Sequence, residues 1–145
     1  MEFIKSGLLM PGDPTLCTPL DFVTAVRKTS PKHQHTTAEQ MQERYTIHFE
    51  SMPRYEYRVL EDGKLIAIMV FTCVDQEVET GGRMFYPTIV QSLKPGVLSG
   101  GYRWLFELAK KHNADFVLIT KSKGYSQSEK TFVRTSKGYK YLCTT

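Results

Sequence analysis

The sequence contains no long hydrophobic run, and this absence excludes a class of protein. No apolar stretch approaches the roughly 18–20 residues that a membrane-spanning helix needs. The first residues, Met1 to Lys5, lack the basic start and long apolar core of a secretory signal. We therefore expect a cytoplasmic protein that does not act in a membrane.

Cysteine is scarce, and its spacing argues against a metal site. Cys17, Cys73 and Cys143 lie far apart and form no C-x-x-C pair, so we expect reduced, mostly buried thiols and no structural zinc. His33 and His35 could chelate a metal, but no third ligand lies near them in the sequence, and an exposed loop is the simpler expectation.

The length and charge of the chain are those of one ordinary globular domain. The 145 residues predict a single domain over residues 1–145 with one core. The formal net charge of +4 is mildly basic and favours an anionic partner, either a phosphorylated cofactor or nucleic acid.

Hydrophobic periodicity and turn residues predict the order of the elements. Helix starts are indicated at Thr18-Pro19 and at Thr36 or Thr37, and hairpin turns at 61–64 and 81–82. The expected strands are 3–10, 55–60, 65–74, 84–93, 116–119 and 139–143. The expected later helices are 102–112 and a last one from Ser126 or Ser128 through Val133, ended by Lys137-Gly138.

A glycine-rich corner, Lys94 to Gly101, lies between an expected strand and an expected helix. Its glycines allow the backbone to turn tightly and to approach a ligand closely, and Ser99 is the predicted N-cap. The free N–H groups of the first helical turn would then favour a phosphate or pyrophosphate. The pattern is neither a P-loop nor the dinucleotide-binding G-x-G-x-x-G, and a glycine-containing loop without a ligand is the plain alternative.

Pro87 interrupts the strand that leads into this corner. Proline donates no ladder hydrogen bond, so the strand should be bulged or unpaired near Pro87. Such a bulge would open a gap against the strand 116–119.

The order of elements resembles that of the GCN5-related N-acetyltransferase (GNAT) superfamily. The segment Gln91 to Gly101 stands where that family has a Gln/Arg-x-x-Gly-x-Gly/Ala loop, and the run 132–139 resembles the family's Phe-Tyr-x-x-x-Gly-Phe signature. The chain departs from the family in two places. The opening of the loop is displaced, and Val133 or Arg134 stands where a general-acid tyrosine is frequent. The short chain is also reminiscent of GNAT-like proteins encoded by bacteriophages, for which the site of action would be the host cytoplasm.

The resemblance implies an α+β protein with three layers, α/β/α. Its central sheet would be mixed and mostly antiparallel, with about six strands flanked by about four helices. It also implies an N-acyltransferase that uses acetyl-CoA as co-substrate and moves the acetyl group to an amine on a small molecule or a protein. Backbone amides of the glycine-rich corner would hold the pyrophosphate, at Gly96, Val97, Leu98, Ser99, Gly100 and Gly101. A valine at Gly100 is then predicted to abolish cofactor binding and leave the fold intact.

Acetyl transfer needs proton acceptors and donors near the expected gap. Tyr86, Tyr125 and Ser126 lie on elements expected there and are our candidates from sequence, while His48 and Glu50 could also face a substrate. Two other functions stay open: a GNAT fold without catalysis that serves as a binding, phage structural or inhibitor protein, and a GNAT-related enzyme that modifies nucleic-acid bases. Exposed edge strands would also allow a homodimer.

Overall fold

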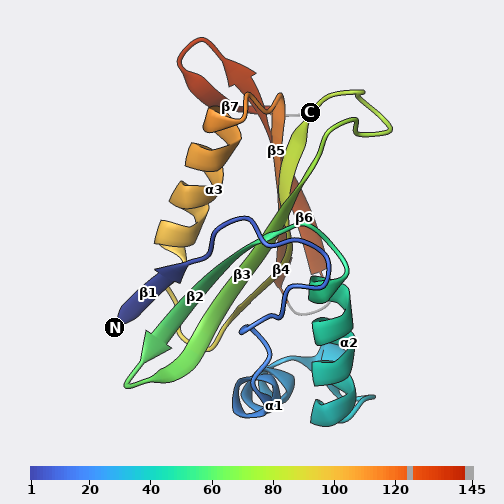
Figure 1. Ribbon diagram of the computed structural model, residues 1–145, viewed down its shortest axis with the longest axis vertical. Coiled ribbons are helices and arrows are strands. Elements are labelled where there is room, and N and C mark those ends of the chain that lie inside the picture. The colour runs from blue at the N-terminus through green and yellow to red at the C-terminus, as the bar shows by residue number, and fades with distance from the viewer. Residues whose placement is uncertain (124–125, 143–145) are drawn as a thin grey trace.

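The protein is built around one mixed sheet of seven strands, seen in a computed structural model that describes residues 1–123 and 126–142 (Figure 1). The strands lie side by side in chain order, from β1 to β7. Their bounds are β1 Glu2–Lys5, β2 Tyr55–Glu61, β3 Lys64–Val74, β4 Met84–Ser92, β5 Phe116–Lys123, β6 Ser126–Thr135 and β7 Gly138–Leu142. Only β4 and β5 are paired in parallel, and every other neighbouring pair is antiparallel.

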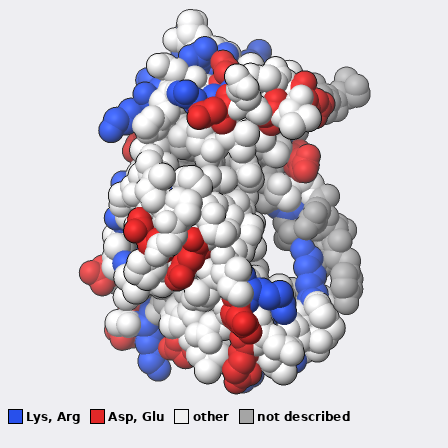
Figure 2. All heavy atoms as spheres, turned by 45° about the vertical axis from the view of Figure 1, so that its right-hand side comes forward, with Lys and Arg blue, Asp and Glu red and all other residues white. Residues whose placement is uncertain are grey.

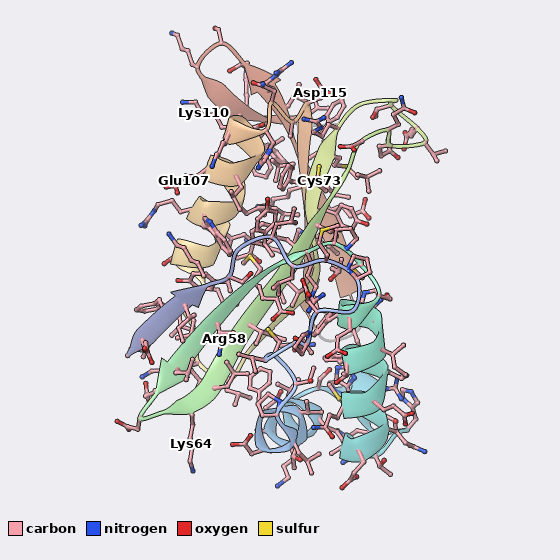
Figure 3. All side chains as sticks on the ribbon, viewed as in Figure 1. Arg58, Lys64, Cys73, Glu107, Lys110 and Asp115 are labelled. Atoms are coloured by element: carbon pink, nitrogen blue, oxygen red, sulfur yellow. The ribbon has the colours of Figure 1, made fainter. Side chains whose placement is uncertain are left out.

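Helices cover both faces of this sheet and make the expected three layers. Figure 1 shows α3 (Ser99–Lys111) on one face and α1 (Leu20–Thr29) with α2 (Ala38–Glu50) on the other. One apolar core joins α3 to the sheet through Trp104 and Leu105, and a second joins the sheet to α1 and α2 through Val26 and Phe49. Figure 3 shows Glu107 and Lys110 on the outer side of α3, away from the sheet.

Local signals explain the first two helices. Thr37 caps α2 in a capping box with Gln40: the Thr37 hydroxyl accepts from the Gln40 N–H at 3.1 Å, and the Gln40 side chain accepts from the Thr37 N–H at 3.0 Å. Helix α1 starts one residue later than expected. Pro19 is its N-cap, and Thr18 instead shares a hydrogen bond with the Thr46 hydroxyl on α2.

The turn between β2 and β3 has the predicted form. Asp62 and Gly63 both have positive φ, 52° and 77°, as a two-residue hairpin turn requires. The segment 75–83 also turns back on itself, since Glu77 and Gly82 are joined by a backbone hydrogen bond of 2.9 Å.

The last predicted helix is wrong. Residues 126–135 form strand β6, which pairs with β5 on one side and with β7 on the other. Thr131, Val133 and Thr135 are β-branched and alternate along it, which suits a strand. Pairing with both neighbours outweighs the weak capping signal of the serines, and the described residues therefore hold seven strands and three α-helices. Gly138 does have positive φ, 117°, but after a hairpin turn and not after a helix.

A buried ion pair fixes the segment that leads from β1 to α1. Arg54 is fully buried and donates to the Glu56 carboxylate at 2.7 Å and to the Asp13 carbonyl at 2.8 Å. The Thr15 hydroxyl also donates to Glu56, at 2.7 Å. These bonds tie the long connection 6–19 to the start of β2. In the described parts of the chain, no helix is long and apolar enough to cross a membrane.

Candidate functional site

The corner between β4 and α3 is anchored by its apolar residues and turns through glycine. Val97 and Leu98 are buried in the core under α3, and Gly96 has a positive φ of 78°. The predicted N-cap is wrong by one residue: Leu98 is the N-cap, and Ser99 is the first residue of α3. Leu98 can take this place because its burial fixes the chain there.

The start of α3 offers backbone N–H groups to a ligand. The N–H groups of Gly101 and Tyr102 both donate to the Leu98 carbonyl, at 3.0 Å and 3.1 Å. The N–H groups of Ser99 and Gly100 lie in the first turn, where no preceding helical carbonyl can accept from them, as at any helix N-terminus. Ser99 is exposed, so this end of α3 is open to solvent.

Gly100 and Gly101 have a packing role that the sequence did not reveal. A Cβ on Gly100 would lie 2.6 Å from the Tyr57 hydroxyl oxygen, and one on Gly101 would lie 3.0 Å from the Tyr57 ring. Tyr57 is buried on β2, so these glycines let α3 lie close against the sheet. A valine at Gly100 would therefore disturb the fold, and it is not the clean test of ligand binding that the sequence suggested.

The fourth strand is bulged where Pro87 predicts it. Phe71 on β3 pairs with Pro87, whereas the preceding Val70 pairs with Ile89, so Thr88 is the extra residue. The parallel pairing of β4 with β5 is also short, since it joins only Met84 to Phe116 and Phe85 to Val117 within the described residues. The two strands part beyond these pairs.

A cleft of about 720 Å³ opens where β4 and β5 part. We call it the splay cleft. Its walls come from the end of α1, the 3₁₀ helix η1 (Pro31–His33), α2, β4, the first turn of α3 and β5. The described residues that line it are Thr29, Ser30, Pro31, Lys32, His33, Tyr45, Pro87, Thr88, Ile89, Val90, Gln91, Tyr102, Thr120 and Lys121. In Figure 2 the molecule is hollowed on its lower right, with Lys or Arg side chains beside the opening.

Three titratable groups in the splay cleft have shifted pKa values. Burial, together with the positive charges of Lys32 and Arg44, lowers the pKa of His33 below its ordinary 6.5. Burial raises the pKa of Tyr45, whose hydroxyl accepts a hydrogen bond of 3.2 Å from the Gln91 side chain, and burial also raises the pKa of Tyr102. At neutral pH the cleft therefore presents a neutral imidazole and two protonated phenols.

The residues predicted from sequence for proton transfer are dispersed. Tyr86 lies on β4 two residues before the bulge, paired with Thr72, and is outside the described lining of the cleft. Tyr125 lies outside the described residues. Ser126 is the first residue of β6, in register with Lys123, and its side chain also lies outside what the structure describes.

Glu50 and His48, the other candidates from the sequence, make contacts within the protein. Glu50 accepts a hydrogen bond of 2.9 Å from the Thr15 backbone, and the His48 ring lies beside Phe49. The sequence did not reveal His33 as a cleft residue, because its place depends on how η1 packs against α2. The ring centroids of His33 and Tyr45 are 6.5 Å apart. The one signal was Ser30-Pro31, which ends α1 and turns the chain back toward the sheet.

A second, smaller cavity of about 300 Å³ lies near the C-terminal end of α3. Cys73, Asp75, Arg83 and His112 are among its lining residues. Burial, with the nearby charge of Asp75, raises the pKa of the Cys73 thiol to about 11. The thiol therefore stays protonated at neutral pH and is a poor nucleophile.

Comparison with known proteins relates this fold to acetyltransferases. No family model and no curated protein matches the sequence. A predicted acetyltransferase from Clostridium acetobutylicum, solved with acetyl-CoA, superposes with a TM-score of 0.50 and 14% identity over 84% of this chain and 81% of that one. An aminoglycoside acetyltransferase from an uncultured soil metagenomic sample superposes with a TM-score of 0.53 and 12% identity over 88% and 84%.

These similarities define the class of fold. The chain is structurally similar to GNAT acetyltransferases at low sequence identity, and its mixed, mostly antiparallel sheet is GNAT-like. At such identities the similarity establishes the fold and not the reaction. The expectation of a phage origin has no support in either comparison.

Proposed function

We propose that the protein transfers an acetyl group from acetyl-CoA to an amine acceptor by direct attack of the amine. We base this proposal on the parting of β4 and β5 near the Thr88 bulge. The cleft that opens there lies between the start of α3 and the helices of the other face. A ligand that enters between the two strands from the α3 side can meet a second ligand from the η1 side.

Acetyl-CoA would bind with its pyrophosphate at the start of α3. The proposed contacts are backbone groups of residues 96–101, above all the N–H groups of Ser99 and Gly100. Val97 and Leu98 contribute by holding the corner in place, because their side chains are buried. The pantetheine and thioester would then extend along β4 toward the bulge.

The transfer requires that the acceptor nitrogen lose a proton before or as it attacks the thioester carbon. The new N–C bond forms, the C–S bond breaks, and the CoA thiolate takes up a proton. His33 is our candidate for the proton acceptor, since it is neutral at pH 7 and lines the cleft. Tyr102 is our candidate for the proton donor to the thiolate, beside the earlier candidates Tyr86, Tyr125 and Ser126.

Thermal unfolding with and without acetyl-CoA tests this proposal. Acetyl-CoA at about 100 times its Kd should stabilise the fold by about 2.7 kcal/mol. For a domain of this size that corresponds to a rise in Tm on the order of 5–10 °C. Free CoA should also raise Tm, and ATP should not. No rise with either CoA species would contradict the proposal.

Ser99→Glu separates ligand binding from stability. Ser99 is exposed at the first position of α3, so a carboxylate there should stabilise the free protein by about 0.3–1 kcal/mol through the helix dipole. The same carboxylate should repel the pyrophosphate and remove the acetyl-CoA shift. Ser99→Gln is the neutral control of matched size, and it should keep most of the shift.

A binding protein without catalysis is the second candidate. Val133 or Arg134 stands at the place of the family's frequent tyrosine, and in this chain that segment is strand β6 and not a helix. Such a protein would show stabilisation by CoA with no turnover of any amine. Nucleic-acid modification rests on the basic charge alone, and it would show as salt-dependent DNA or RNA binding.

A further inference from the structure

The splay cleft has cations in its walls and no carboxylate among its described lining residues. The cations are Lys32 on η1 and Lys121 on β5, and His33, which follows Lys32 on η1, is neutral at pH 7. Residues 122–127, whose side chains the structure does not describe, include no Asp or Glu in the sequence. Glu129 on β6 pairs in register with Thr120 on β5, and it is outside the described lining.

The effect of these cations is visible on His33. After burial, the positive charges of Lys32, Arg44 and His35 are the causes that lower its pKa. Basic side chains therefore lie close to the imidazole on the η1 side of the cleft. An acceptor that carries several ammonium groups is disfavoured there, because the described lining offers those groups no carboxylate.

We propose that the acceptor is a small amino acid, whose carboxylate is bound by Lys121 while its amine faces η1. This inference rests on the proposed acetyl transfer and names the substrate class of the same site. Lys121 is exposed and lines the cleft from β5, whereas His33 lines it from η1, so an anion held by Lys121 would place an adjacent amine inside the cleft. A lysine ammonium is a suitable partner for a carboxylate, with which it makes a charge-assisted hydrogen bond.

The chemistry also separates this acceptor from an aminoglycoside. An aminoglycoside presents several ammonium groups and no carboxylate, so it would meet two lysines and no carboxylate among the described lining residues of this cleft. The similarity to an aminoglycoside acetyltransferase is therefore used for the fold alone and not for the acceptor.

Acetylation of matched acceptors tests the inference. Steady-state rates with acetyl-CoA would be measured for a series of amino acids, for the C-terminal amide of each, and for an aminoglycoside. The amide has the lower amine pKa and more neutral nitrogen at pH 7.5, so simple nucleophilicity favours it. We expect kcat/KM to be higher for the free acid by about tenfold or more, as loss of a charge-assisted bond would give.

Lys121→Gln identifies the group responsible. It should raise KM for the free acid about tenfold and reduce the preference over the amide. Lys130→Gln is the matched control, because Lys130 lies on β6 over the Tyr141 ring at 5.8 Å and outside the cleft lining, and it should keep the preference.

Three outcomes would overturn the inference. One is an equal or higher kcat/KM for the amides or for the aminoglycoside. Another is a Lys121→Gln protein that keeps the preference for the free acid. The third is a Lys121→Gln protein whose only defect is a smaller acetyl-CoA shift in Tm, since Lys121 would then serve the cofactor phosphates. The acetyl-CoA shift of the unaltered protein, measured without acceptor, reports on the proposed function separately.

Discussion

His33 stands out among the single residues because its surroundings keep its imidazole neutral. It lies on η1, lines the splay cleft and contacts Tyr45 edge to face. Burial and neighbouring cations lower its pKa, so it loses its proton below its ordinary value of 6.5. A base with this property is active throughout the neutral range.

The pH profile of acetyl transfer should follow this group. If His33 takes the acceptor proton, kcat/KM should fall as the pH falls through the lowered pKa, so the acidic limb should lie below pH 6.5. His33→Ala should lower kcat by about 10²–10⁴ and remove that limb. His35→Ala is the control: His35 is exposed and outside the described lining, so the rate should stay, and the limb should move slightly to higher pH, because one cause of the lowered pKa of His33 is removed. A His33→Ala enzyme with the original rate and profile would exclude this role.

The lowered pKa of His33 also makes the stability of the protein depend on pH. The unfolded chain binds a proton at His33 more readily than the folded one, so protonation favours unfolding. Above about pH 7.5 the His33 imidazole is neutral in both the folded and the unfolded state, and this effect on stability is absent. As the pH falls through 6.5 toward the lowered pKa of His33, the free energy of unfolding should decrease.

Among the elements, α2 presents Tyr45 to the cleft and is fixed at its start by the capping box of Thr37 and Gln40. Thr37→Ala should lower the free energy of unfolding by about 1 kcal/mol, because it leaves the Gln40 N–H without its side-chain acceptor. Urea denaturation would measure this change. Thr24→Ala within α1 is the control: its hydroxyl only returns to the Leu20 carbonyl, so alanine should be neutral or slightly stabilising. Equal effects of the two substitutions would contradict the assignment.

Elements with strong local signals could be predicted from the sequence, and those decided by distant pairing could not. The cap at Thr37, the turn at Asp62-Gly63 and the bulge near Pro87 each follow from the chemistry of one or two residues. Strand β6 follows from its place between β5 and β7, which no local pattern contains.

The candidate site was likewise predictable only in part. The glycine-rich corner and the bulge come from a continuous stretch, 84–101, and could be recognised there. The other wall of the cleft brings η1 and Tyr45 to β4 from more than forty residues away, as the hydrogen bond between Tyr45 and Gln91 illustrates. The packing of Gly100 and Gly101 against Tyr57 is equally long-range, and it explains why glycines there have a role beside the proposed phosphate site.

At the scale of the whole molecule, the fold joins the two proposed ligand sites where β4 and β5 part. The start of α3 lies on one face and η1 on the other, and the parting of β4 from β5 connects them. The second cavity, near Cys73 and His112, is lined by none of the residues of this path. It therefore serves as an internal reference for binding.

The most direct measurement is a backbone amide NMR titration of the whole protein with acetyl-CoA. We expect shifts in two groups of amides, Thr88–Gln91 beside the bulge and Ser99–Tyr102 at the start of α3, while the amides of Cys73 and His112 stay in place. Ser99→Glu should remove both groups of shifts together. Shifts confined to Cys73 and His112, or none at millimolar acetyl-CoA, would contradict the proposal that this cofactor binds between the start of α3 and the bulge of β4.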